Sequence, residues 1–559
     1  MSLESWIILG WIFVLVWVPF VIFTNRKVHP KVLFWLFMVE LWERFSYYGM
    51  RAFLVLYLTK ALVTGGFGLK KEVAFGIYAA YGALVYLTPL IGGFMADKVM
   101  GFRRAIIWGA MLMAAGQFTL FTGSGTDFVS QRQYEERTKA REAADPDAAK
   151  QNPAAVQEAV EKDIAAGRAP AAGNQILLFG GLALLVVGNG FFKPNISSMI
   201  GKFYPQGDSR RDGAFTIFYM GINTGAFIAP LTCGYVGETI GWKYGFLLAG
   251  IGMISGLIIF LIASSRGILE NYADPPADAP KALGPVPALP AIYLGTFVLV
   301  GLAAALIYQN DIVDILLGVI GLGVIVYMMI LSFKYPVEER QRIWVIVILL
   351  FFTTVFWGFF ELAGSALNVF TDENVDKKVF GSEIPASVFQ AVNAFFIMVC
   401  APLFTLMWAY LAKKGIEPAA PVKFAIGLLL LGLGFLVLNI SKGAATAGIV
   451  PLIFLIVLYL LHTLGELALS PVGLSLVTKL APAKIVGFMM GFWFLSSAIA
   501  HQAGKFIAGA MAVDSKAPAE VRLEKSIEVF NQVGLFAVGC SVVLFLLSPI
   551  IRKWMHGIR

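Results

Sequence analysis

The sequence ELWERFSYYGMR, residues 40–51, places two carboxylates and two guanidinium groups between strongly apolar segments, 32–39 and 52–58. On a helix, Glu40, Glu43 and Arg44 share one face because they are three and four residues apart. Arg51 returns near that face two turns later. The whole segment is long enough to span a bilayer, which takes about 20 helical residues. Charges inside such a span are costly and usually mark an ion or substrate pathway. We therefore expect this segment to form the first wall of a transport cavity.

The composition supports a membrane protein. The chain has 559 residues, of which 58% are hydrophobic and 14% are charged, whereas about a quarter of the residues in a soluble domain are charged. The net charge of +8 does not indicate a nucleic-acid partner, because the basic residues cluster in particular loops. The three cysteines lie in apolar segments, and neither they nor the four histidines have metal-ligand spacing. We expect no metal and no cofactor.

Hydropathy predicts a set of membrane-spanning helices that together give an all-α membrane protein. One extra N-terminal helix covers residues 6–23. Six spans follow at 32–59, 73–96, 103–122, 175–201, 212–236 and 243–264, two at 289–309 and 312–333, and six more at 342–370, 385–412, 422–440, 449–479, 484–511 and 528–551. Six plus six spans with a joining segment suggest a two-halved transporter that binds its substrate near the membrane midplane.

The loop charges predict the orientation. With the alternation above, every basic loop falls on one side, which puts the C-terminus in the cytoplasm by the positive-inside rule. These loops contain Lys98, Arg103 and Arg104; Lys202, Arg210 and Arg211; Lys413 and Lys414; Lys479 and Lys484; and Arg552 and Lys553. A signal peptide is the alternative for residues 6–23, but residues 1–4 are not basic and no Ala-x-Ala site follows.

The expected domains follow from these spans. Residues 1–27 form the extra transmembrane helix, 28–265 the N-terminal six-helix bundle, 266–341 a linker with two additional helices, and 342–559 the C-terminal bundle. Residues 123–174 are polar and carry charges of both signs, which predicts an external insert that is helical or partly disordered. Residues 266–288 are rich in Pro and Ala, which is typical of a linker.

Several motifs carry a resemblance to a known family. The pattern E-x-x-E-R-F-x-Y-Y-G at residues 40–49 resembles the signature of the proton-dependent oligopeptide transporters, a branch of the major facilitator superfamily. FFKPN at 191–195, with RRDGAFxxFYxGINxG at 210–225, resembles that family's second signature region, and GELxxSPxGLS at 465–475 resembles a third element. GGxxADKxxGxRR at 92–104 is similar to the superfamily's loop motif, which latches helix ends on the cytoplasmic side. The alternative for this loop is a basic turn with a capping Asp97. The resemblance implies the major facilitator fold.

Three further charged residues lie inside predicted spans. Lys193 is deep enough that snorkelling to the interface is difficult, and Pro194 exposes carbonyl groups that suit a cavity lining. Glu361 is a lone acid in an aromatic span, where Leu362 stands in place of the family's usual Gln. Glu466 lies in the third family element. The alternatives are an interfacial lysine and structural acids satisfied by a neighbouring serine. We expect His462 and His501 to be structural, and the second span has no histidine where some animal relatives have a functional one.

The resemblance also implies roles for these side chains. Arg51 would pair with Glu361 and Lys193 with Glu466, while Arg51 and Lys193 would hold a peptide carboxylate. Glu466, Asn223 and Asn393 would hold the peptide amino group, and Glu40, Glu43 and Arg44 would couple the proton. The residues that would line side-chain pockets are Tyr47, Tyr48, Tyr86, Trp357, Trp493 and Ser497, for which ordinary packing is the alternative.

We therefore predict a symporter that imports di- and tripeptides with protons by alternating access. Because breaking a buried ion pair changes the proton affinity of its carboxylate, substrate binding can be coupled to proton movement. We expect a monomer in the lipid bilayer of the cell inner membrane. One alternative keeps the fold and carries nitrate or a peptide-like compound. Another is a membrane enzyme or sensor, but the sequence has no nucleophile–base set, metal spacing or nucleotide loop.

Overall fold

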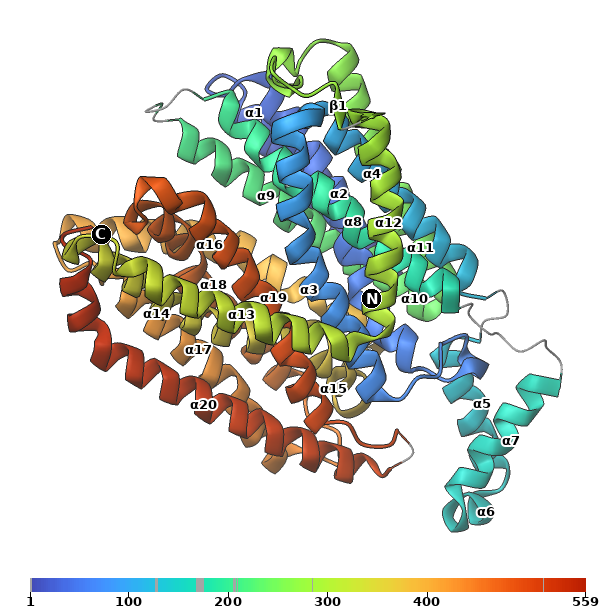
Figure 1. Ribbon diagram of the computed structural model, residues 1–559. Coiled ribbons are helices and arrows are strands. Elements are labelled where there is room, and N and C mark those ends of the chain that lie inside the picture. Colours follow the sequence, from blue (N-terminus) through green and yellow to red (C-terminus); the bar gives the residue numbers. More distant parts are fainter. Residues whose placement is uncertain are drawn as a thin grey trace. The chain divides into compact units, whose positions relative to one another are not determined.

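The structure is a computed structural model that describes residues 3–125, 129–166, 175–204, 208, 210–283, 285–515 and 517–558. Within these residues the regular structure is helical apart from two hairpins of two-residue strands (Figure 1). The hairpins pair β1 (Ala282–Leu283) with β2 (Val286–Pro287) and β3 (Lys378–Val379) with β4 (Ser382–Glu383).

The helices up to the middle of the chain are α1 (Leu3–Asn25), α2 (Lys31–Thr59), α3 (Lys71–Met95), α4 (Gly101–Gly123), α5 (Gln131–Ala144), α6 (Pro146–Gln151), α7 (Pro153–Ala166), α8 (Gln175–Lys202), α9 (Arg211–Ala229), α10 (Tyr235–Thr239), α11 (Trp242–Ser265) and α12 (Ala288–Tyr308). The remaining helices are α13 (Asn310–Ser332), α14 (Val337–Phe360), α15 (Ala366–Asn374), α16 (Ala391–Lys413), α17 (Ala420–Ser441), α18 (Leu452–Leu480), α19 (Val486–Ala510) and α20 (Ala519–Trp554). Short helical turns, 3₁₀ or π, lie at η1 (Leu62–Thr64), η2 (Ala96–Met100), η3 (Pro230–Gly234), η4 (Glu270–Ala273), η5 (Glu361–Gly364), η6 (Ala386–Gln390), η7 (Lys442–Ala444) and η8 (Ala483–Ile485).

Every span predicted from hydropathy falls on helical structure, although 212–236 and 342–370 each run over two α-helices joined by a short helical turn, η3 or η5. Among the described residues, twelve stretches are long and apolar enough to cross a membrane, and one of them, Lys71–Gly123, contains both α3 and α4. α2 and α19 are not among the twelve. These two helices carry several of the buried polar groups described below, which lower their apolar character.

Proline marks both the ends and the irregularities of these helices. α2 begins directly after Pro30, whose extended backbone precedes the first turn. Pro194 lies inside α8, where it removes one backbone hydrogen bond. Pro230 begins the π-helical turn η3 that joins α9 to α10. Such π turns are frequent at functional sites.

The chain divides into two compact units. The first comprises residues 1–74, 88–308 and 378–391, and the second 75–87, 309–377 and 392–559. In the first unit α2 packs against α9 and α11, and α4 packs against α8 and α11. In the second unit α17 packs between α18 and α20, while α14 and α13 both contact α19. The domain limits expected from the sequence stay a prediction.

The extra N-terminal helix α1 is packed against the first unit. The Trp11 indole donates a hydrogen bond to Thr232 Oγ1 at 3.1 Å, and its ring lies 6.5 Å from Trp42 of α2 and 6.3 Å from Phe45. These tertiary contacts are those of a folded helix within the unit, which agrees with the interpretation of residues 6–23 as a helix.

The described part of the polar insert is helical. α5, α6 and α7 fold on a small apolar cluster of Val129, Val160 and Ile164, against which Val63 and Tyr134 pack. Residues 126–128 and 167–174 of the predicted insert lie outside the described residues.

The Pro- and Ala-rich linker contacts the first turn of α4. Arg103 forms an ion pair with Asp274 at 3.2 Å, and its guanidinium also donates to the Glu270 carbonyl. Arg103 of the predicted loop motif therefore pairs with this linker.

Candidate functional site

The three charged residues at the start of the signature sequence form one buried cluster on α2. Arg44 Nε lies 2.8 Å from Glu40 Oε1 and 2.5 Å from Glu43 Oε2. Glu40 is 1% exposed, Glu43 0% and Arg44 2%. The helical spacing therefore brings these groups together as the sequence predicts. We call them the α2 cluster.

The neighbouring helices α8 and α9 surround the α2 cluster. The Asn189 side chain of α8 donates to Glu43 Oε1 at 3.2 Å, and Lys193, one turn further on, is near enough to act on Glu43 electrostatically. Gly225 of α9 allows the close approach of α2, because a Cβ there would lie 2.8 Å from Arg44 Cβ. Two carboxylates against one guanidinium leave the cluster short of positive charge, a deficit that a proton or Lys193 can offset.

Arg51 and the two signature tyrosines lie on the same helix as the α2 cluster. The Tyr47 and Tyr48 rings meet edge to face at 5.2 Å. The Arg44 guanidinium lies 5.6 Å from the Tyr47 ring, and that of Arg51 lies 5.8 Å from the Tyr48 ring. Both distances are within the range of cation–π attraction. The two tyrosine rings therefore attract the two guanidinium groups and also present aromatic surface.

Lys193 and Asn223 come from α8 and α9. Lys193 precedes Pro194, and the next residue, Asn195, donates to the Phe191 carbonyl at 2.7 Å. The Asn223 amide donates to the Tyr219 carbonyl at 2.9 Å on its own helix. This hydrogen bond leaves the Asn223 side-chain oxygen as the group that can accept from a substrate amine.

Glu361 stands at the break between α14 and η5 in the second unit. It is buried, and its Oε1 lies 3.7 Å from His501 Nε2 of α19. The His501 ring packs on the ring of Tyr86 at 5.2 Å. His501 was expected to be structural, and the structure places it beside a predicted site carboxylate.

Glu466 lies on α18 with two polar neighbours. The Asn393 amide donates to Glu466 Oε2 at 3.1 Å and to Thr463 Oγ1 at 2.9 Å. Thr463 donates in turn to the Tyr459 carbonyl. The structure therefore brings together Asn393 and Glu466, which the family resemblance assigns to the peptide amino group. Thr463, which the sequence analysis did not single out, precedes Glu466 by three residues and shares its helix face.

The remaining predicted side chains have aromatic or backbone contacts. Trp357 meets Phe360 edge to face at 5.2 Å. Trp493 lines a small cavity with Phe424 and Gly473, and the Ser497 hydroxyl donates to the Trp493 carbonyl at 3.4 Å. These contacts are those of ordinary packing, so a substrate role for Trp357, Trp493 and Ser497 stays a prediction. The pairs Arg51–Glu361 and Lys193–Glu466 also stay predictions, because their members belong to different units.

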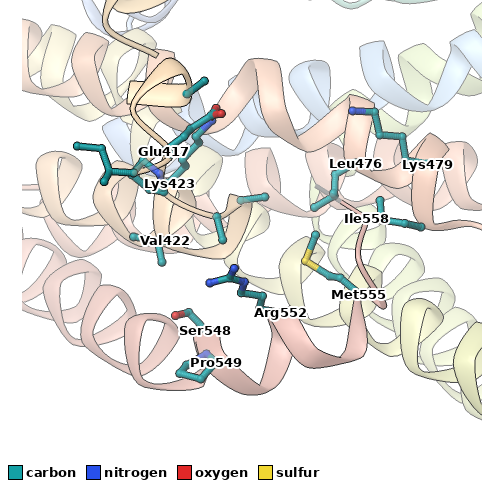
Figure 2. A pocket seen from close by; sticks show the side chains of 16 residues that line it. Glu417, Val422, Lys423, Leu476, Lys479, Ser548, Pro549, Arg552, Met555 and Ile558 are labelled. Carbon is teal, nitrogen blue, oxygen red and sulfur yellow. The ribbon is translucent and has the colours of Figure 1, made fainter. Parts of the chain in front are cut away.

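A cavity of about 1000 Å³ lies in the second unit where the loop before α17 approaches the ends of α18 and α20 (Figure 2). Its charged lining consists of Glu417, Lys423, Lys479 and Arg552, and Lys423 is paired with Glu417 at 2.5 Å. None of the predicted site residues lines it. The buried charges identify a site more directly than cavity size does. No group of three or more potential metal ligands occurs among the described residues.

A separate polar contact lies in the loops beside the first unit's helix ends. His29 Nδ1 lies 2.9 Å from the Tyr204 hydroxyl, and Arg210 pairs with Asp208 and donates to the Val28 carbonyl. Burial, followed by the charge of Arg210, lowers the pKa of His29, and Asp208 acts in the opposite direction. Burial likewise raises the pKa of Tyr204 to about 12. This contact joins two loops and involves none of the residues of the α2 cluster.

The residues that sequence reasoning missed had weak signals. Asn189 is a single polar residue between two glycines in an apolar helix. Thr463 follows His462, and His501 precedes Gln502, in otherwise apolar segments. A polar side chain in a span was a signal for each of them. Which carboxylate each would meet depends on helix packing between distant segments.

Comparisons with known proteins agree with this arrangement of helices. Residues 103–523 match the model of the POT family. The chain is 35% identical over 546 residues to the peptide transporter YePEPT of Yersinia enterocolitica, covering 95% of this chain and 96% of the relative. It is 31% identical to a dipeptide and tripeptide permease A of Cronobacter turicensis, covering 95% and 94%. Among solved structures, a mutant of peptide transporter POT in complex with alafosfalin has a TM-score of 0.76 and 34% identity, covering 95% of this chain and 96% of that one.

These matches and the helical architecture define a multi-pass membrane transporter of the major facilitator fold. The chain belongs to the POT family.

Proposed function

We propose that the protein imports di- and tripeptides together with protons by alternating access of its two halves. The observation that carries the proposal is the set of buried carboxylates with exchangeable partners: the α2 cluster in the first unit and Glu466 with Asn393 in the second. Relatives named as a peptide transporter and as a dipeptide and tripeptide permease support the substrate class.

A short peptide presents one cation and one anion at a separation set by its chain length. In the proposed complex Arg51 and Lys193 hold the peptide carboxylate, and Glu466 with Asn393 and Asn223 holds the amino group. Asn393 already donates to Glu466, so the carboxylate is oriented before a substrate amine arrives. The aromatic side chains Tyr47, Tyr48, Tyr86, Trp357 and Trp493, with Ser497, then contact the variable middle.

The proton is proposed to bind at the α2 cluster. Arg44 Nε donates a hydrogen bond to Glu40 Oε1 and forms an ion pair with Glu43 Oε2. Protonation of Glu43 or Glu40 weakens the electrostatic attraction between that carboxyl group and Arg44. The positive charge of Lys193 also attracts the Glu43 carboxylate. A substrate carboxylate that binds Lys193 offsets this charge and therefore changes the proton affinity of Glu43. This link between substrate and proton is the proposed coupling.

The working unit is proposed to be a single chain in the inner membrane with its C-terminus in the cytoplasm. The support for this orientation is the basic side chains that end the last helix, Arg552 and Lys553. Protease accessibility of a C-terminal tag in right-side-out vesicles tests it, since a cytoplasmic tag stays protected.

Uptake into liposomes tests the function. With an inward proton gradient, labelled dialanine accumulates above its external concentration, and a protonophore abolishes the accumulation. Excess unlabelled dialanine competes and nitrate does not. Competition by nitrate without competition by dialanine would favour the anion-carrying alternative, and the absence of any gradient-driven accumulation would exclude the proposal.

A further inference from the structure

A small cavity in the second unit brings together titratable groups from helices far apart in the sequence. It is lined by Glu361 of η5, Tyr78 of α3, and His501 and Lys505 of α19, among others. Its lining places a carboxylate, an imidazole and an ammonium side by side in the interior of the unit. The family resemblance implies a role for the carboxylate and leaves the imidazole and the ammonium unexplained.

His501 is held with its Nε2 toward Glu361. The imidazole is 5% exposed, and Nε2 lies 3.7 Å from Glu361 Oε1. The opposite ring nitrogen, Nδ1, faces α3, where a Cβ at Gly82 would lie only 2.6 Å away. The ring can therefore take this position because residue 82 is a glycine.

Tyr86 fixes the plane of the imidazole. Its ring lies 5.2 Å from that of His501 at an interplanar angle of 32°, which is a favourable offset arrangement. Tyr86 is one helical turn from Gly82, so the same face of α3 both admits the imidazole and covers it. The direction of Nε2 is thus set by packing on α3.

Lys505 follows His501 by one turn of α19 and is bound by two carboxylates of α13. Its Nζ lies 2.6 Å from Asp311 Oδ1 and 2.8 Å from Asp314 Oδ2, and Gln502 donates to Asp314 as well. Asp311 and Asp314 neutralise the ammonium group, so Lys505 does not act on Glu361 as an unpaired cation.

We propose that His501 shares a proton with Glu361 and so sets the pH range over which this carboxylate takes part in transport. The proton resides on Glu361 Oε1 or on His501 Nε2, and a movement of the His501 ring within the cavity transfers it between these atoms. No bond other than the N–H or O–H bond forms or breaks. His501 is a positioning residue for the proton of Glu361, and this role rests on the proposed proton-coupled function.

Two interacting groups titrate as a pair, and the first proton binds more tightly than to either group alone. Replacing His501 by glutamine keeps a polar side chain but removes the second proton site. In proteoliposomes, His501→Gln should move the pH of half-maximal gradient-driven dialanine uptake to more acid values by about one unit. Exchange of dialanine across the membrane without a proton gradient should fall less than twofold.

The matched control is His462→Gln. His462 is the other histidine buried in a span, and its ring packs against Phe435 at 4.6 Å and Phe360 at 6.2 Å. Its substitution should leave the pH midpoint of uptake unchanged. In a Glu361→Gln background, His501→Gln should cause no additional shift, because the partner of the shared proton is already absent.

The outcomes separate this inference from the proposed function. If the unsubstituted protein shows no acid-driven uptake, the proposed function fails. If that uptake is present but His501→Gln shifts its midpoint by less than about 0.2 pH units, the inference is overturned. Such a shift is on the order of the scatter in these profiles and well below the shift expected for interacting groups. The inference is equally overturned if the shift persists in the Glu361→Gln background.

A second measurement does not depend on the folding of a His501 variant. The chain has four histidines, so the imidazole signals of ¹⁵N-histidine-labelled protein in nanodiscs can be followed with pH by NMR. One signal should titrate about one unit lower in Glu361→Gln than in the unsubstituted protein, because the nearby carboxylate favours the charged imidazole. Four unchanged titrations would contradict the proposal.

Discussion

The buried acids of the two units are held in different ways. In the first unit Glu40 and Glu43 share the permanently charged Arg44, which lies on the same helix. In the second unit Glu466 meets the neutral side chain of Asn393, and Glu361 meets the titratable His501, each from a different helix. A fixed cation stabilises ionised carboxylates, whereas amides and imidazoles tolerate either protonation state. Protonation of an acid in the first unit therefore weakens an ion pair, whereas Glu466 and Glu361 of the second unit can keep these contacts in either protonation state.

The largest expected effect comes from removing the cation of the first unit. Arg44→Met leaves two carboxylates buried without their shared partner, at a cost of about 3–5 kcal/mol. Little folded protein should be recovered, as measured by size-exclusion chromatography and thermal unfolding in detergent. The matched variant Glu40→Gln/Glu43→Gln/Arg44→Met, which has no charge at this place, should recover most of the stability. If the Arg44→Met protein were as stable as the original, the acids of the first unit would not depend on a fixed cation, and the contrast with the second unit would be lost.

Neutralising an acid in the second unit should impair transport without unfolding the protein. Gln at position 466 can still accept the Asn393 hydrogen bond, so Glu466→Gln should change the unfolding free energy by less than about 1 kcal/mol. It cannot pair with the peptide amino group, and dialanine uptake should fall on the order of 100-fold. Thr463→Val, which keeps the carboxylate, is the control and should lower uptake only a few-fold. Comparable uptake by Glu466→Gln and the original protein would exclude the assigned role.

A smaller effect is expected from the contact between α13 and α19. Asp314→Asn removes one of the two carboxylates on Lys505, and the less neutralised ammonium then favours ionised Glu361. The pH midpoint of uptake should move to more acid values by a few tenths of a unit, roughly the shift that one partly screened charge causes. Asp311→Asn should shift it less, because the Asp311 side chain is 91% exposed. A larger shift for Asp311→Asn than for Asp314→Asn would contradict the expectation that the more exposed aspartate has the weaker effect.

The smallest effect concerns the loops outside the membrane. The pKa of His29 lies below its ordinary value of 6.5 in the folded protein, mainly because of burial. The neutral imidazole is therefore favoured by folding. Its contribution to stability is present above pH 6.5 and is lost as the pH falls through the lower folded-state pKa. His29→Gln should make the melting temperature less sensitive to pH between 7.5 and 5. An unchanged pH dependence would show that the contact with Tyr204 does not contribute.

The sequence predicted the helices and the α2 cluster well because both depend on local spacing. The long apolar runs fix where helices form, and positions 40, 43 and 44 share a face on any helix. Asn393 and Glu466 were assigned to the same part of the site only through the family resemblance, since they lie 73 residues apart. The partnership of Glu361 with His501, on helices distant in the sequence, was not predicted. It depends on the packing of α3 and α19 at Gly82, and periodicity within one helix contains no information about such a contact.

Dipeptide-dependent proton movement tests the central claim most directly. A pH-sensitive dye inside proteoliposomes should report acidification when dialanine is added outside, and Glu43→Gln should abolish this signal while exchange of labelled dialanine continues. Acidification by Glu43→Gln at the rate of the original protein would contradict the assignment of the proton to the buried carboxylates of α2.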